Sequence, residues 1–231
     1  GYGKTSLVLI LLISSIIVIG TIFSGCSDSN TVSSNATPDN MSFSVKISDT
    51  GLDDPNAAFV ITEAKALISE FEIEATDGQS NEIHLKPFII NFDLSSNLKE
   101  LLSVYIPTKT YKKVKFQIHK PEDNETPSDP DFITGGRYSF IIKGTYNGSP
   151  FTFKSKKTVN LILNMNGDLT IGNNKINVSM LINKTGWFKN SGGSDLDPRD
   201  SGNENEIDDN LKNSFKSVFK DDDKNGIPDG L

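Results

Sequence analysis

Residues 138–153 read Tyr-Ser-Phe-Ile-Ile-Lys-Gly-Thr-Tyr-Asn-Gly-Ser-Pro-Phe-Thr-Phe, and this stretch decides the fold. Apolar side chains at Tyr138, Phe140 and Ile142, and again at Phe151 and Phe153, alternate with other residues, a period typical of half-buried strands. The Asn-Gly pair between the two arms supplies the positive backbone angles of a two-residue turn. The stretch therefore predicts an antiparallel hairpin.

The same period of two recurs on both sides of the hairpin. Ala64 and Ile68 have the opposite parity from Phe71 and Ile73, which predicts a β-bulge that swaps faces within one long segment. About nine or ten short strands with turns at this spacing predict a mainly β fold, an antiparallel β-sandwich. The other expected strands cover residues 43–47, 83–92, 114–118, 159–165, 169–171 and 176–182.

Two stretches depart from this period and predict helices. Residues 95–102 place Leu98, Leu101 and Leu102 at helical spacing behind Ser95, which can cap the first turn. Near the C-terminus, apolar residues three or four apart form one helical face, and this helix is expected to lead straight into the last loop of the chain. These residues are Ile207, Leu211, Phe215, Val218 and Phe219.

The N-terminal end has the pattern of an export signal. An apolar run over residues 7–19 follows Lys4 and is shorter than the roughly 20 residues that a transmembrane helix needs. The run leads to Phe-Ser-Gly-Cys at residues 23–26, which resembles a bacterial lipobox, where the cysteine is lipidated and becomes the first residue of the mature protein. The resemblance implies a signal peptide over residues 1–25 and a lipid anchor on Cys26 in the outer membrane, on its periplasmic or outer face. A membrane span or an ordinary cleaved signal is the alternative.

Composition agrees with export and narrows the class of partner. The chain has a net charge of −7 and one cysteine, Cys26, so the part that follows it can form no internal disulfide. Such an acidic chain does not suit nucleic acid, and we expect no nucleic-acid partner. Residues 26–40 are rich in Ser, Asn, Asp, Thr and Pro and predict a flexible tether.

A second resemblance concerns the first half of the fold. Within residues 43–118, the segments Phe-Glu-Ile at 71–73, Phe-Asp-Leu at 92–94 and Val-Lys-Phe at 114–116 lie at intervals that resemble a family of bacterial lipoproteins. That family is known only for a domain of unknown function. The resemblance implies a transthyretin-like or carbohydrate-module-like sandwich and no particular activity.

The best-formed chemical motif is Asp-Asp-Asp-Lys-Asn-Gly-Ile-Pro-Asp at residues 221–229. Counted from its first residue, oxygen-bearing side chains fall at positions 1, 3, 5 and 9, a backbone carbonyl is available at position 7, and position 6 is glycine, as in an EF-hand loop. Calcium prefers such oxygen ligands. The candidate ligands are Asp221, Asp223, Asn225, Ile227 and Asp229.

The loop also resembles the calcium repeats of thrombospondin type 3 domains. It lacks the bidentate glutamate of position 12, because the sequence stops at Leu231. Incomplete loops of this kind imply a weak site, and a solvated acidic tail is the alternative. Ligands from the preceding acidic segment are a further option: Asp195, Asp197, Asp200 and Glu204.

Other features indicate function less directly. A second acidic loop, with five carboxylates between Glu122 and Asp131, is interpreted as a solvated excursion. Trp187 and Tyr138 are the candidate ligand-binding aromatics, since either can stack on a sugar ring or fill the core. The two histidines, His84 and His119, are expected to be structural, because no nucleophile elbow, zinc motif or phosphate loop accompanies them.

These observations predict a chain in four parts: the signal peptide 1–25, the tether 26–40, a β-sandwich domain over 41–190, and an acidic linker, helix and calcium loop over 191–231. We expect a non-enzymatic binding module for a glycan or an envelope protein, with calcium as its one cofactor. A structural or assembly lipoprotein that binds no small ligand is the alternative.

Overall fold

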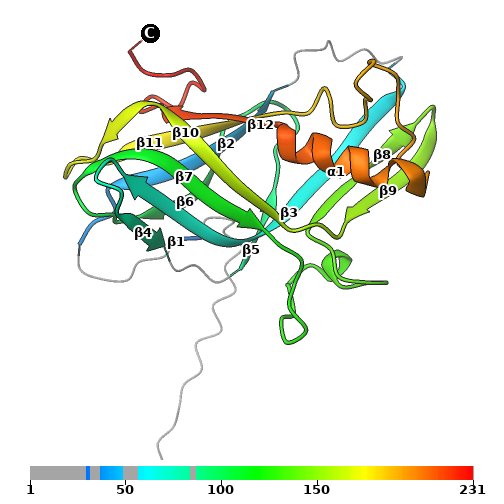
Figure 1. Cartoon of the computed structure of the whole chain (residues 1–231), viewed down its shortest axis with the longest axis horizontal. Helices are drawn as coiled ribbons and strands as arrows, with labels where there is room; N and C mark the ends of the chain where they lie inside the picture. The colour runs from blue at the N-terminus through cyan, green and yellow to red at the C-terminus, as the bar shows by residue number, and fades with distance from the viewer. Residues whose placement is uncertain (1–29, 32–36, 49–56, 84–86, 231) are drawn as a thin grey trace, which may run out of the picture.

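The protein is mainly β in a computed structural model that describes residues 30–31, 37–48, 57–83 and 87–230 (Figure 1). The predictions for the signal peptide, for Cys26 and for His84 concern residues outside these ranges, as does most of the tether. Among the residues that are described, no helix is long and apolar enough to cross a membrane.

The predicted hairpin is confirmed. β8 (Phe140–Tyr146) and β9 (Ser149–Ser155) pair antiparallel from one end to the other. The two turn residues take positive φ values, 49° at Asn147 and 76° at Gly148. These values are those that an Asn-Gly turn provides without strain.

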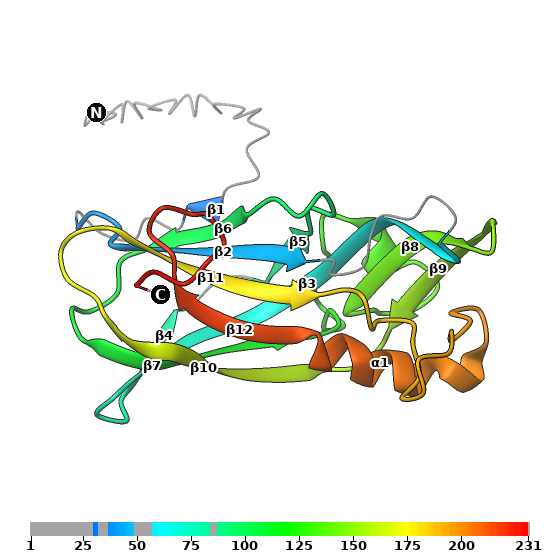
Figure 2. The same cartoon turned by 90° about the horizontal axis from the view of Figure 1, so that it is seen from above.

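The strands form one strongly curled sheet in the order β1-β6-β2-β11-β12-β10-β7-β3-β8-β9, with β4 and β5 attached to β3 (Figures 1 and 2). The remaining strands are β1 (Asn30–Thr31), β2 (Met41–Ser48), β3 (Phe59–Ala75), β4 (Ser80–Ile83), β5 (Phe88–Asn91), β6 (Lys99–Val104), β7 (Thr110–Ile118), β10 (Val159–Thr170), β11 (Ile176–Asn183) and β12 (Phe215–Lys220).

The expectation of an antiparallel sandwich is wrong in two respects. The pairs β1–β6, β2–β11 and β10–β12 are parallel, so the sheet is mixed. The strands also belong to one continuous curled sheet, because β12 joins β11 to β10. Parallel neighbours need a long connection between them, and β2 and β11 are joined by residues 49–175, more than half of the chain, rather than by a hairpin. The alternation of apolar residues along a strand does not indicate which distant strands pair with each other.

β3 is the longest strand and crosses the molecule diagonally (Figure 2). Its first half pairs with β8 and its second half with β7. The register with β7 shifts between Ile68 and Glu70, which confirms the predicted bulge. The shift lets Ala66 and Phe71, residues of opposite parity, both lie in the core, with 0% and 2% exposure.

Both predicted helices need correction. Residues 99–104 form β6, which pairs with β2, so the leucines of this segment face a sheet partner instead of a helical stripe. The C-terminal helix is α1 (Glu204–Asn213), and it ends before β12 rather than running into the last loop. β12 fills the place between β11 and β10, and its aromatic residues fit a buried strand better than a helix.

The core lies on the concave side of the curled sheet and is closed by α1 and the segment that precedes it. One hydrophobic cluster contains residues of nearly every strand together with Trp187, Ile207 and Leu211. A smaller cluster joins Leu67 and Ile141 to Phe132, which lies in the short 3₁₀ helix η1 (Pro130–Phe132) of the acidic loop.

Candidate metal centre in the C-terminal loop

The loop 221–229 is organised around the carboxylate of Asp221, which is fully buried where β12 ends. Its Oδ1 accepts a hydrogen bond from the backbone N–H of Asn225 at 2.9 Å, and its Oδ2 accepts from the N–H of Gly226 at 3.0 Å and from the Ser179 hydroxyl at 2.6 Å. Gly226 has a φ of +79°, and an added Cβ would lie 2.9 Å from the Lys46 side chain, so the turn needs glycine.

A buried polar cluster on β2 and β11 fixes the base of the loop. The Asn177 side chain donates to the carbonyl of Asp221 at 3.0 Å, and its backbone N–H donates to Asp222 Oδ1 at 3.1 Å. The hydroxyls of Ser42 and Ser44 in turn donate to Asn177 Oδ1 at 2.8 and 2.7 Å. Since these buried groups are hydrogen-bonded, the loop has a rigid base.

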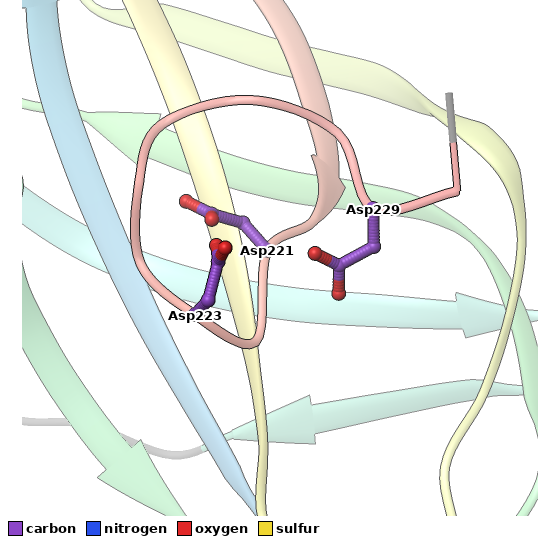
Figure 3. Close-up of side chains that lie close together, drawn as sticks. All are labelled: Asp221, Asp223 and Asp229. Atoms are coloured by element: carbon purple, nitrogen blue, oxygen red, sulfur yellow. The ribbon is translucent and has the colours of Figure 1, made fainter.

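The loop brings three predicted ligands together. Oxygens of Asp221, Asp223 and Asp229 all lie within 4.8 Å of one another (Figure 3). The first is buried and the other two are exposed. Carboxylate oxygens at such separations can hold a hard cation, so the group could bind a metal ion.

Asn225, another predicted ligand, already uses its side-chain oxygen and nitrogen. Asn225 Oδ1 accepts the backbone N–H of Ile227 at 2.7 Å, and its Nδ2 donates to Asp223 Oδ2 at 2.8 Å. The acidic residues upstream do not join the group: Asp195 pairs with Lys189, and Asp197 pairs with Arg199.

Lysines neutralise only part of the loop. Lys220 Nζ lies 2.6 Å from Asp222 and 3.5 Å from Asp229, and the hydrogen bond that it donates to Asp222 raises the pKa of Lys220 above its ordinary value. Lys224 Nζ points away to Glu100 at 2.7 Å. In the described part of the chain, Asp221 and Asp223 have no ion-pair partner, which leaves negative charge at the point where the three carboxylates meet.

The candidate aromatic ligands lie in the interior. Trp187 is fully buried and meets Phe140 edge to face at 5.9 Å, which corresponds to the core-filling alternative. Tyr138 is 9% exposed, donates its hydroxyl proton to the Gly135 carbonyl at 2.9 Å and has Lys154 Nζ 4.8 Å from its ring centre. Neither ring offers a free face to a sugar.

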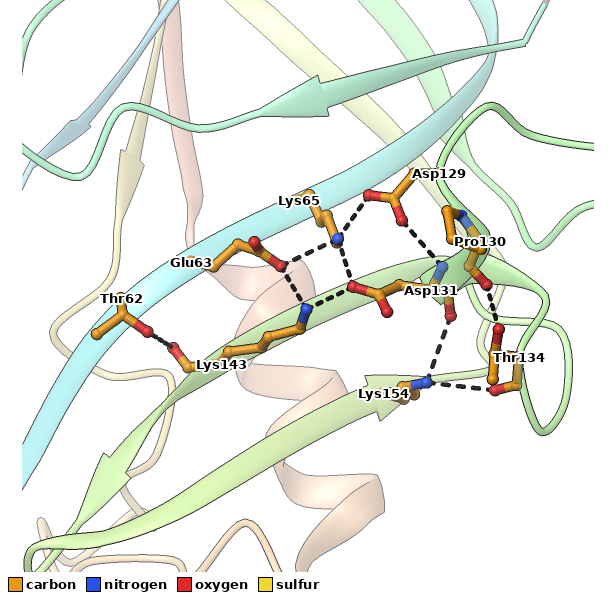
Figure 4. A network of polar contacts seen from close by, with 9 residues as sticks. All are labelled: Thr62, Glu63, Lys65, Asp129, Pro130, Asp131, Thr134, Lys143 and Lys154. Atoms are coloured by element: carbon orange, nitrogen blue, oxygen red, sulfur yellow. Dashed lines mark hydrogen bonds and ion pairs between the residues drawn. The ribbon is translucent and has the colours of Figure 1, made fainter.

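The second acidic loop is not a solvated excursion. Lys65 on β3 is 3% exposed, and its Nζ lies 2.5 Å from Asp129, 2.7 Å from Asp131 and 3.0 Å from Glu63 (Figure 4). Lys143 on β8 joins the network through Asp131 and Glu63. We refer to these five residues as the Lys65 network. It holds η1 against the sheet.

Sequence reasoning missed the Lys65 network, although a signal was present. Lys65 stands within the apolar run Ala-Lys-Ala-Leu-Ile at 64–68, and a lysine in such a run requires acidic partners. Burial lowers the pKa of Lys65, but the hydrogen bonds that its ammonium donates to three carboxylates outweigh this effect and raise the pKa above the ordinary value.

Comparisons with known proteins assign no family. No protein family matches the chain, and no curated protein sequence does. A solved structure that it resembles is MbnP from Methylosinus trichosporium, with 11% sequence identity over 69% of this chain and 79% of MbnP and a TM-score of 0.42. A likeness at this level assigns no activity. The resemblance of residues 43–118 to uncharacterised lipoproteins gains no support from a family match.

Proposed function

We propose that this chain is a lipid-anchored lipoprotein of the outer membrane, that its β fold is a non-enzymatic binding module, and that its last loop binds calcium. The lipobox at residues 23–26 supports the anchor. The observation that carries the calcium assignment is the geometry of Asp221. This buried carboxylate accepts the backbone N–H groups of loop positions 5 and 6 and thereby wraps the chain around the point where Asp223 and Asp229 converge.

The chemistry of the loop favours calcium over a transition metal. All available donors are oxygens, which suit calcium, whereas zinc and copper sites use histidine or cysteine. Three carboxylates imply an affinity on the order of 10⁻⁴–10⁻³ M. The role of the ion is to fix the C-terminal loop on the base formed by β2 and β11.

For the binding module, a protein partner has more support than a glycan. The two aromatic side chains with the best potential for sugar stacking are buried, as described above. A polysaccharide panel, run with calcium and again with chelator, tests the glycan option.

Thermal unfolding with calcium and with chelator tests the calcium site. At ten times the dissociation constant, calcium should stabilise the wild type by about 1.4 kcal/mol, a rise in Tm of about 3 °C. Asp223→Ala should abolish this rise. Asp168→Ala is the matched control, because Asp168 is an exposed aspartate outside the loop, and it should keep the full rise.

The controls separate the outcomes. A wild type whose Tm does not respond to calcium would remove the ion from the proposal. An equal rise in the wild type and in Asp223→Ala would place the ion elsewhere on the chain.

A further inference from the structure

A cleft of about 550 Å³ opens between β5, the beginning of β6 and the loop that precedes η1. This volume lies within the range of ligand sites, roughly 300–1,000 Å³. Its walls combine apolar residues with a few polar groups. They include Leu67, Phe88, Ile89, Asn91, Lys99 and Pro127.

One wall of the cleft is an unpaired strand edge. β5 pairs with β3 on one side only, with Leu67 opposite Ile89. The N–H of Leu67 donates to Ser139 and its carbonyl accepts from His119, so both of its backbone groups point away from β5. In an antiparallel pair of this kind the opposite residue also directs its backbone groups outward. Ile89 therefore presents its N–H and C=O to the cleft side.

The next outward-facing residue shows that this edge requires partners. The carbonyl of Asn91 accepts a hydrogen bond from Lys99 Nζ at 3.0 Å. Ile89 has no such cap: β5 pairs with β3 alone, and within the described chain no hydrogen bond outside that pairing reaches the N–H or C=O of Ile89. Lys99 makes no ion pair within the same ranges, so its ammonium remains available to a carboxylate.

The opposite wall already accepts an extended segment. β1 adds to the edge of β6 by parallel pairing, with Asn30 opposite Leu102 and Thr31 opposite Ser103. Residues 99–101 of β6, which precede the paired residues Leu102 and Ser103, line the cleft. A site for an extended chain in the cleft would thus lie next to an existing strand addition.

We propose that the cleft binds an extended peptide segment of a protein partner, which adds to the edge of β5. The peptide backbone pairs with the N–H and C=O of Ile89, an apolar side chain lies against Leu67 and Pro127, and an acidic side chain pairs with Lys99. Strand addition to an exposed edge draws its affinity from main-chain hydrogen bonds and its specificity from alternate side chains. This inference rests on the proposed binding function and names its partner class.

The test begins with selection from a displayed library of random linear peptides on the full chain in detergent. The best peptide is then synthesised with acetyl and amide ends and titrated against variants. Ile89→Pro removes the outward N–H, and proline is tolerated on strand edges whose N–H faces outward. Binding should weaken about tenfold, the value of one backbone hydrogen bond in a dry site.

Two further variants keep the test decisive. Ile89→Val retains the N–H and the β propensity and should bind the peptide like the wild type. Lys99→Met should weaken peptides that contain an acidic residue, and Lys99→Arg should restore them. The Tm of each variant reports whether it is folded.

Two outcomes would overturn the inference. One is that no linear peptide is selected, as expected if the chain's own N-terminal segment occupies the cleft. The other is that the selected peptide binds Ile89→Pro as tightly as the wild type. Either result leaves the calcium titration unaffected, so failure of the cleft and failure of the calcium loop are distinguishable.

Discussion

The chain has two acidic loops, residues 122–131 and 221–229, and the fold treats them in opposite ways. In the first, two aspartates face lysine ammonium groups that project from β3 and β8. In the second, three aspartates face one another at the end of β12. The density of acidic residues is similar in both loops. The groups that lie opposite the carboxylates therefore decide whether these form ion pairs within the protein or a candidate cation site.

The difference follows from where each loop leaves the sheet. The first loop connects β7 to β8 and passes over the outer face of β3, from which Lys65 projects. The second leaves β12 above a base of serine and asparagine side chains, which offer hydrogen bonds but no charge. Asp129 and Asp131 of the first loop are thus neutralised by lysines of the protein itself, whereas Asp221 and Asp223 of the second have no ion-pair partner among the described residues.

The largest expected effect is that of Lys65→Met, which keeps the length of the side chain and removes the ammonium. Asp129 and Asp131 then lose their shared partner. Breaking a buried ion pair from one side costs about 3–5 kcal/mol, and the partial exposure of the two carboxylates places this variant near 3 kcal/mol. Urea unfolding measures the loss. Lys112→Met, which removes a surface partner of Glu74, is the control and should change stability by less than about 0.5 kcal/mol. Equal losses of stability in the two variants would contradict a stabilising role of the Lys65 network.

The second effect is a pH dependence. Hydrogen bonds from Lys143 and then Lys65 lower the pKa of Asp131 from 3.8 to about 2. A carboxylate with a lowered folded pKa stabilises the protein above its unfolded pKa, and this contribution is lost as the pH falls from 3.8 towards 2. The contribution is about 2 kcal/mol.

Asp131→Asn should therefore be less stable than the wild type near neutral pH and equally stable at the acidic end of this window. Chemical unfolding at several pH values measures the difference. A constant gap between the two proteins over the whole window would show that Asp131 acts by packing and not by charge.

Local patterns predicted the local parts of the fold. The β8–β9 hairpin and the bulge in β3 depend on residues close in sequence, and the alternation of side chains reports them directly. β12 was not predicted, because the spacing of Phe215, Val218 and Phe219 also suits a helix. The segment forms a strand because it pairs with β11 on one side and β10 on the other, which the sequence spacing does not reveal.

The sites show the same contrast between features that depend on residues close in sequence and features that depend on the fold. Asp221, Asp223 and Asp229 belong to one short loop, so their spacing was enough to predict that they converge. The Lys65 network joins residues about sixty positions apart, and the sequence contains only half of that information, a lysine in an apolar strand. Its acidic partners follow from the fold alone.

A third acidic position, Asp208, sharpens the comparison, because among the described residues it forms neither an ion pair nor a cluster of converging carboxylates. Asp208 on α1 is 5% exposed, and within the described part of the chain neither of its oxygens has a hydrogen-bond partner of ordinary geometry. Burial raises its pKa above 3.8; Ser155 and Lys157 oppose the shift, and the negative charge of Glu204 adds to it. A raised carboxyl pKa stabilises the protein below the unfolded value, and this contribution is lost as the pH rises through the folded value.

Asp208→Asn should therefore stabilise the protein near neutral pH, by about 1 kcal/mol, since it removes a buried charge without a partner. At low pH, where the carboxyl is neutral, the variant and the wild type should have equal stability. Differential unfolding at the two pH values measures this. A destabilised variant at neutral pH would show that a partner outside the described residues binds Asp208.

The smallest expected effect is a change in Tm whose direction distinguishes the two acidic loops. In chelator, Asp223→Asn removes one of three converging negative charges and keeps an oxygen that can accept the Asn225 N–H, now at 3.2 Å. Without a cation the like charges repel one another, so this variant should melt about 1 °C above the wild type. Asp131→Asn, the same substitution in the other acidic loop, should melt below it. Asp168→Asn controls for the change in net charge and should leave the Tm unchanged. If Asp223→Asn also lowered the Tm in chelator, a cation of the protein itself would have to neutralise Asp223, and the two loops would work in the same way.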